Sequence, residues 1–207
     1  LVSACATVNE SKPADSDPDI AISSEAKAFE MKCETDLAMV LTLLDKQEKI
    51  TEPFTVETVL VPLNELQIAL SNGARLASTY KSVHPDPDLR KVATDCLVKY
   101  SDIGTQLSLS RATYDAVNML DVSHEPDDTK RFYELTLRGF RLSGVDKDEE
   151  TRDKIRALSD EITQIGQTWD KNILDDVRYI EVTTEDLKGL PQDYIDAHPP
   201  GENGLIK

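Results

Sequence analysis

Aromatic residues and glycines are scarce in this 207-residue sequence. Aromatic residues make up 5% of the chain, and glycine occurs only eight times. β-Sandwiches and barrels need many tight turns and many strand-forming side chains, so this scarcity argues against both architectures. No run of residues is long and apolar enough to span a bilayer as a helix. The remaining composition, 39% hydrophobic and 30% charged, is typical of a helix-rich globular protein.

Positive charge is also in short supply. The chain has 23 Lys and Arg residues against 39 Asp and Glu residues, which gives a formal net charge of -16. A protein that binds a phosphate backbone needs a basic face, and no basic stripe occurs in the sequence. We therefore expect no nucleic-acid partner and no attraction to an anionic membrane surface.

Cysteine occurs three times, at Cys5, Cys33 and Cys96, without a CxxC or CxxCH motif. Zinc-finger and haem-attachment patterns are therefore excluded. Cys33 and Cys96 fall on the apolar faces of two predicted helices, and we expect both to be buried free thiols.

Motifs that carry catalysis are absent as well. There is no HExxH, no glycine-rich phosphate loop and no GxSxG in these 207 residues. The histidines His84, His124 and His198 lie in predicted loops, are not spaced to share a metal, and are expected to be solvated. The acidic pairs at 127–128 and 175–176 flank helix ends, where solvation is the simpler interpretation than acid–base catalysis. No catalytic, cofactor-binding or metal-ligating residue is assigned.

The N-terminal residues LVSAC resemble the end of a bacterial lipoprotein signal, which makes Cys5 a candidate lipidation site. A basic region and an initiator Met are missing, so we expect the chain to begin within a precursor. Residues 1–18 are then a signal remnant and flexible tether, and the protein belongs to the bacterial cell envelope, either periplasmic or anchored to the outer membrane. The alternative is a chance run of small residues before a disordered terminus.

The strongest helical pattern runs from Asp146 to Asp176. Asp146 and Glu149 can form a capping box at its start, and at ~1.5 Å per residue the helix would be roughly 40 Å long. Because its stripe is continuous, we expect Trp169 to lie in the core. The apolar residues recur at steps of three and four: Ile155, Leu158, Ile162, Ile165, Trp169 and Ile173.

Further helices precede this one, and the helical domain is predicted to cover residues 19–178. Asp86 and Ser110 are expected to cap the helices that follow them, and another helix covers 131–142. Pro62 stands either in the first turn of a helix or at a kink. The predicted faces of the first three helices are Phe29, Cys33, Leu37, Val40 and Leu44; Val59, Leu63, Leu66 and Leu70; and Leu89, Ala93, Cys96, Tyr100, Ile103 and Leu107.

The pattern changes near the C-terminal end, in residues 179–207. Segments 178–182 and 205–207 read as short strands around a capped turn at 184–190, closed by Gly189. Because the last strand has no evident partner except segment 178–182, we expect a truncated strand-containing segment. The predicted fold is mainly α: long antiparallel helices, bundle-like, with short β segments near the C-terminal end.

Several short stretches carry a resemblance to a known family. Residues 131–145, which include LRGFRLSGV, resemble an RxFRLAG segment. WDKNILD at 169–175 is similar to an F-x-x-N-[VIL]-L-D helix ending, with Trp in place of Phe, and EDLKGLP at 185–191 matches an E-[ED]-L-x-G-L-P turn. Segment 55–59 occupies the place of the family's TxxN(T)-type helix start. Segment 82–90 occupies the place of its loop before the third helix. The combination, spread over 55–207, resembles the oligopeptidase A, thimet oligopeptidase and neurolysin family of zinc metallopeptidases.

The resemblance implies that the chain is the mostly helical N-terminal part of such an enzyme. In the family this region forms one wall of a deep channel that admits short peptides. Zinc is expected in the full-length enzyme, held through HExxH and a glutamate in a C-terminal catalytic region that is missing here, so no site residue is carried over. The implied partners are short peptides and that missing region. The alternative function is a non-catalytic acidic helical lipoprotein that acts as a binding or scaffold module.

Overall fold

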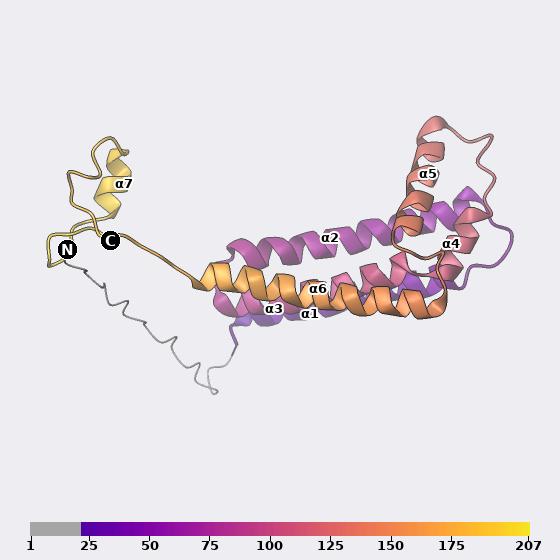
Figure 1. Cartoon of the computed structure of the whole chain (residues 1–207), viewed down its shortest axis with the longest axis horizontal. Helices are drawn as coiled ribbons and strands as arrows, with labels where there is room; N and C mark the ends of the chain where they lie inside the picture. Colours follow the sequence, from indigo (N-terminus) through magenta and orange to yellow (C-terminus); the bar gives the residue numbers. More distant parts are fainter. Residues whose placement is uncertain (1–21) are drawn as a thin grey trace, which may run out of the picture. The chain divides into compact units, whose positions relative to one another are not determined.

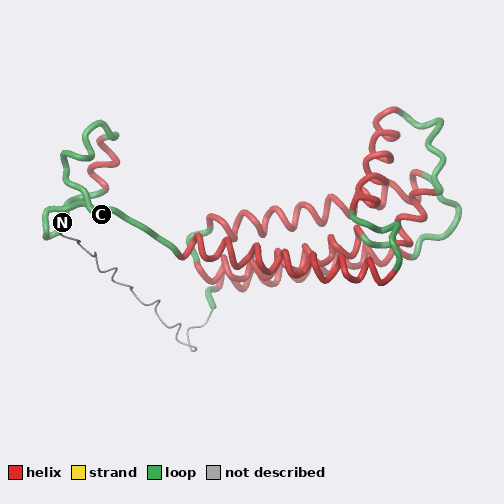
Figure 2. Tube along the Cα trace, viewed as in Figure 1, coloured by secondary structure: helices red, strands yellow, loops and turns green. Residues whose placement is uncertain are grey.

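A computed structural model of the chain describes residues 22–207, which are mainly helical (Figures 1 and 2). The mainly-α prediction is confirmed for this part of the chain. Two compact units divide within α6, one ending at Ser159 and the other beginning at Asp160. The elements are α1 (Ser24–Glu48), the π-helical turn η1 (Val56–Leu60), α2 (Val61–Val83), α3 (Pro87–Ser108), α4 (Arg111–Asn118), α5 (Asp127–Leu142), α6 (Glu149–Asp175) and α7 (Gln192–Ala197).

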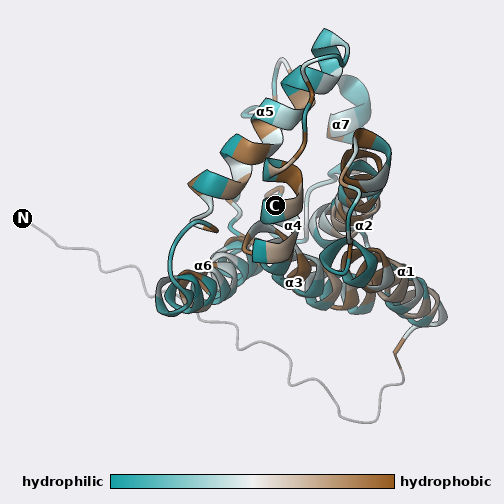
Figure 3. Cartoon of the chain, turned by 90° about the vertical axis from the view of Figure 1, so that its right-hand side faces the viewer, coloured by the Kyte–Doolittle hydropathy of each residue, from teal (hydrophilic) through white to brown (hydrophobic). Residues whose placement is uncertain are grey.

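The core of the first unit lies between α1, α2 and α3, which run side by side and alternate in direction (Figure 1). Figure 3 shows that each helix mixes hydrophobic and hydrophilic residues, as amphipathic helices do. The predicted faces of α1 and α3 are buried in full, and Leu63 and Leu66 of α2 are completely buried. α2 packs tightly against α3 at Gly73, where an added Cβ would lie 2.2 Å from the Tyr100 hydroxyl.

Side-chain caps position the helices, and the two predicted ones are confirmed. Asp86 Oδ1 accepts a hydrogen bond from the Asp88 amide at 2.9 Å, and Ser110 Oγ accepts one from the Thr113 amide at 3.4 Å. Ser23 caps α1 and also hydrogen-bonds Asp86 Oδ2 through its hydroxyl. This bond to Ser23 is the main reason why the pKa of Asp86 is held below its ordinary value. The start of α1 is thereby tied to the loop before α3.

The structure resolves the position of Pro62. η1 leads directly into α2, and Pro62 occupies the first turn of α2. The amide of buried Gln47 donates to the carbonyl of Val59 at 3.3 Å, which fastens the end of α1 to η1.

The prediction of free thiols is wrong for Cys33 and Cys96. The two residues are buried as expected, but they form a disulfide that joins α1 to α3, with a Cα–Cα distance of 6.3 Å. Each sequence position shows only that its side chain faces the core. The pairing depends on which α1 residue lies opposite which α3 residue, and no spacing rule along the chain gives that information.

The long helix departs from the prediction in two ways. Asp148, rather than Asp146, caps it: Asp148 Oδ1 accepts from the Thr151 amide at 2.8 Å, while Asp146 pairs with Lys147. Moreover, α6 has no buried residue, and Trp169 is 68% exposed instead of lying in the core. An apolar stripe shows that a helix is amphipathic, but it does not show which surface covers that stripe.

The predicted short strands are not seen among the described residues. Val182 and Ile206 form only an isolated antiparallel bridge, in which each amide donates to the other's carbonyl at 2.9 and 2.8 Å. Turns at Gly189 and Gly204, both with positive φ, redirect the chain before a ladder can extend. The short helix α7 was not predicted. The domain boundary expected between residues 178 and 179 stays a prediction.

Candidate functional site

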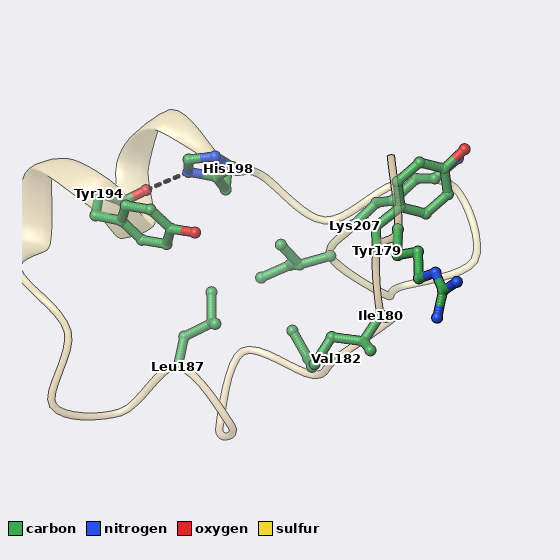
Figure 4. Close-up of a pocket in the computed structure, with 9 residues that line it drawn as sticks. Tyr179, Ile180, Val182, Leu187, Tyr194, His198 and Lys207 are labelled. Carbon is green, nitrogen blue, oxygen red and sulfur yellow. Dashed lines mark hydrogen bonds between the residues drawn. The ribbon is translucent and has the colours of Figure 1, made fainter. Parts of the chain in front are cut away.

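The C-terminal unit contains a cavity of about 380 Å³ (Figure 4). Its walls come from the segment before the Val182 bridge, the turn before Gly189, α7 and the last two residues. The lining residues are Arg178, Tyr179, Ile180, Val182, Leu187, Tyr194, His198, Ile206 and Lys207.

Local hydrogen bonds hold the apolar side of this pocket. The Val182–Ile206 bridge brings together two segments far apart in this unit, and Ile206 and Leu187 are both buried. The turn that carries Leu187 is fastened by Asp186, whose Oδ2 accepts from the Thr183 hydroxyl at 2.7 Å and amide at 2.8 Å. These bonds, the hydroxyl bond first, lower the pKa of Asp186.

Aromatic rings and cations form the rest of the pocket. The rings of Tyr194 and His198 stack with centroids 4.2 Å apart, and His198 Nδ1 lies 2.8 Å from the Tyr194 carbonyl oxygen. Lys207 Nζ lies 3.7 Å from the centre of the Tyr179 ring. Arg178 is held by Asp176 at 2.7 Å, an interaction that raises the pKa of Arg178 and lowers that of the carboxyl group.

The chemistry of this lining suits binding. Aliphatic and aromatic surface can take up an apolar side chain, and the two cations can face a carboxylate or a carbonyl oxygen. The nine lining residues include no Ser, Cys or carboxylate that His198 could activate. The pocket therefore offers a surface for recognition, without a nucleophile–base pair among the residues that line it.

The residues singled out in the sequence are not brought together. Across residues 22–207, no three His, Cys, Asp or Glu side chains form a group that could hold a metal ion, so zinc does not fit there. Cys5, the predicted lipidation site, lies outside the described residues. None of the described helices has the length and apolarity needed to cross a membrane.

The prediction of solvated loop histidines is wrong for His84. Its Nδ1 accepts from the Asp86 amide at 3.2 Å, its ring packs edge-on against Tyr80, and its Nε2 lies 3.6 Å from Glu25 Oε1. His198 also has partners, because its ring stacks on Tyr194. The spacing of four between those two residues was a signal that a short helix places both rings on one face.

Comparison with known proteins gives distant, partial homology to oligopeptidases. No protein-family model matches the chain. Oligopeptidase A of Haemophilus influenzae is 28% identical over 151 residues, which are 70% of this chain and 22% of that protein. Thimet-like oligopeptidase of Dictyostelium discoideum is 29% identical over 126 residues, or 57% of this chain and 19% of that protein. Saccharolysin of Saccharomyces cerevisiae is 23% identical over 153 residues, 71% of this chain and 21% of that protein.

The chain therefore spans about a fifth of the length of the curated relatives it matches. The similarity extends over 70% of the chain, so it is not confined to one motif. It supports the family resemblance seen in the sequence at the level of distant homology.

Proposed function

We propose that the chain is the N-terminal helical part of a zinc-dependent oligopeptidase that cleaves short peptides, and that it forms one wall of the peptide channel. The observation that carries this proposal is the similarity over 151 residues to an oligopeptidase A. The helical architecture agrees with it, since a wall built of long packed helices is rigid. Zinc and its ligands belong to another part of such an enzyme.

In this proposal the chain contributes shape and recognition. The apolar pocket with Arg178 and Lys207 beside aromatic rings is suited to hold a side chain or a backbone carbonyl of a peptide. Substrate cleavage then depends on residues outside the described part of the chain.

A chimera tests this function. Residues 55–207 replace the corresponding part of Haemophilus influenzae oligopeptidase A, and cleavage of a fluorescence-quenched short peptide is measured. We expect zinc-dependent cleavage to be retained. A control chimera carries an unrelated helical bundle of the same length and should be inactive. If the chimera folds, binds zinc and still cleaves no peptide, the proposed function is wrong.

The 207-residue chain by itself provides a second check. We expect it to leave the same peptide intact and to retain no stoichiometric zinc after dialysis. Zinc-dependent turnover by this chain alone would show that its own residues form a catalytic site, and the proposed division of labour would then fail.

We further propose that the protein acts in the bacterial cell envelope, with Cys5 as a lipid anchor. The Cys33–Cys96 disulfide supports this location, because disulfides persist in oxidising compartments and are rare in the cytosol. Mass spectrometry of protein from a native membrane fraction should find a lipidated Cys5 as the first residue. An unmodified Cys5 preceded by residues 1–4 would contradict the anchor.

A further inference from the structure

We propose that His198 determines what the pocket of the C-terminal unit binds: its Nε2 accepts a hydrogen bond from a backbone amide of a peptide whose apolar side chain fills the pocket. All of the lining residues fall between 178 and 207, so the inference concerns one compact unit. That the ligand is a peptide rests on the proposed function. That it must donate a hydrogen bond to His198 follows from the geometry of the ring.

A carbonyl oxygen determines which ring nitrogen of His198 carries the proton. His198 Nδ1 lies 2.8 Å from the Tyr194 carbonyl oxygen, a contact that the dashed line in Figure 4 marks. Because a carbonyl oxygen can only accept, Nδ1 holds the hydrogen and donates it. In the neutral ring the other nitrogen is then an acceptor. His198 therefore offers a lone pair at Nε2.

The direction of that lone pair is also held. The rings of His198 and Tyr194 stack with their planes 26° apart, and the two residues are four apart at the end of α7. The stack and the hydrogen bond act on the same imidazole, so a rotation of the ring would break both. An acceptor held in one direction is what a specific contact with a ligand requires.

The apolar part of the pocket limits the size of the ligand. Leu187 and Ile206 are buried, and Figure 4 shows Leu187 and Val182 pointing inward. The volume of about 380 Å³ lies near the lower end of the range of roughly 300–1,000 Å³ that is common for ligand sites. We therefore expect one apolar side chain and its adjoining backbone to fill the pocket.

The polar groups of the pocket match a peptide group. Lys207 Nζ lies 3.7 Å from the centre of the Tyr179 ring, and an ammonium group has three hydrogens to donate. A peptide group carries one N–H and one carbonyl oxygen. His198 Nε2 can accept from the N–H, and Lys207 can donate to a carbonyl. The pocket thus offers both an acceptor and a donor beside its apolar surface.

A metal ion is a poorer ligand for His198 Nε2. Two cations, Arg178 and Lys207, line the same pocket and would repel it. Among residues 22–207, no three His, Cys, Asp or Glu side chains come together to complete a metal site. The lone pair at Nε2 is therefore assigned to a hydrogen bond.

The first experiment determines the tautomer of His198. The 207-residue chain is labelled with ¹⁵N, and the imidazole nitrogens are observed by NMR at a pH above the ordinary range of histidine ionisation. The signals of His198 are assigned by their loss in His198→Phe. We expect the hydrogen on Nδ1 and an unprotonated Nε2. A hydrogen on Nε2 would overturn the proposal.

The second experiment measures binding of acetyl-Ala-Leu-Ala-amide to the same chain by NMR titration. We expect saturable shifts of the amides in 178–207 and of His198 Nε2. A peptide with Ser in place of Leu should bind at least tenfold more weakly. Methylation of the peptide amides one at a time should find one position where loss of the N–H weakens binding about tenfold, the effect of one lost hydrogen bond.

Matched variants connect that N–H to His198. His198→Phe keeps a ring that can stack on Tyr194 but has no acceptor, so it should bind about tenfold more weakly. It should also no longer distinguish the sensitive methylated peptide from the parent, which completes a double-mutant cycle. His124→Phe makes the same change at an exposed histidine and should leave both measurements unchanged. Circular dichroism confirms that the variants are folded.

Two binding results would also overturn the proposal. One is a set of methylated peptides that all bind the wild type equally well, a result that requires no protein variant. The other is a His198→Phe chain that still discriminates against the sensitive methylated peptide. Because the chain alone is tested for binding, the outcome is independent of the cleavage assay. Binding as described with an inactive chimera would refute the proposed function alone, and an active chimera without such binding would refute this inference alone.

Discussion

Helices α3 and α6 carry the same kind of apolar pattern and end in opposite environments. In α3 the periodic residues, from Leu89 to Leu107, are all buried, and one of them is linked to α1 by a disulfide. In α6 the periodic residues from Leu158 to Ile173 are exposed, Ile155 is partly exposed, and no residue is fully buried. The comparison shows that periodicity determines which side of a helix must leave water. It does not determine whether the partner lies within the same part of the chain.

The largest loss of stability is expected when the disulfide between α1 and α3 is removed. The Cys33–Cys96 link closes a loop with a sequence separation of 63. Its removal by Cys33→Ser with Cys96→Ser should lower the free energy of unfolding by about 4 kcal/mol. Urea unfolding monitored by circular dichroism measures this. A reductant should destabilise the wild type and leave the double variant unaffected. Equal stability with and without the disulfide would contradict the prediction.

The next largest loss of stability is expected from shortening a side chain in the core. Leu63 of α2 is completely buried, so Leu63→Ala should lower the free energy of unfolding by about 3 kcal/mol through lost burial and the cavity left behind. The same urea titration measures it. A loss as small as that of a surface substitution would mean that the α2 face is loosely packed.

Replacement of glycine by alanine should be tolerated less well at Gly73, where α2 contacts α3, than at an exposed position of a helix. A Cβ there would overlap the ring of Tyr100, so Gly73→Ala should destabilise by about 2 kcal/mol although alanine favours helices. Gly166→Ala in α6 is the matched control, and since nothing lies within 4 Å it should stabilise the helix. Thermal unfolding of both variants would compare them.

The Asp86 cap at the start of α3 should make the free energy of unfolding depend on pH in the acidic range. The Ser23 hydroxyl lowers the pKa of Asp86 below 3.8, so Asp86 contributes stability that is present above pH 3.8 and is lost as the pH falls through the folded-state value. Asp86→Asn retains a capping side chain but should remove this part of the acid sensitivity. Ser23→Ala should reduce it. Urea titrations at several pH values below neutrality measure the slopes, and identical slopes in all three proteins would contradict this account.

The smallest effect is expected at Ile165, on the exposed apolar face of α6. Ile165 is exposed, so Ile165→Ala should change the free energy of unfolding by no more than about 0.5 kcal/mol. The contrast with Leu63→Ala is the direct test of the comparison between the two regions. A loss of several kcal/mol would show that Ile165 is covered in solution.

Local features of the fold could be read from the sequence because a few neighbouring residues determine them. Asp86 and Ser110 cap their helices through amides two and three residues away, and the buried faces of α1 and α3 follow from periodicity. At the start of α6 two aspartates compete, and Asp148 reaches the amide of Thr151.

Features that depend on distant partners could not be predicted in this way. The Cys33–Cys96 bond depends on the relative position of two helices, and the exposure of Trp169 depends on what covers α6. The candidate pocket was missed because it forms only when Val182 meets Ile206 and α7 adds its rings. The strand-like composition of segments 178–182 and 205–207 predicted paired strands, but the two segments form only one isolated bridge.

The disulfide also decides how the protein would respond to a mechanical load. A pull applied between the N-terminal end and the C-terminal end would pass through Cys33, across the sulfur atoms to Cys96, and onward. Residues 34–95, which include most of α1 and all of α2, would carry none of that tension. A chain tethered at one end and pulled at the other could therefore extend at its termini while the segment inside the closed loop stayed unloaded.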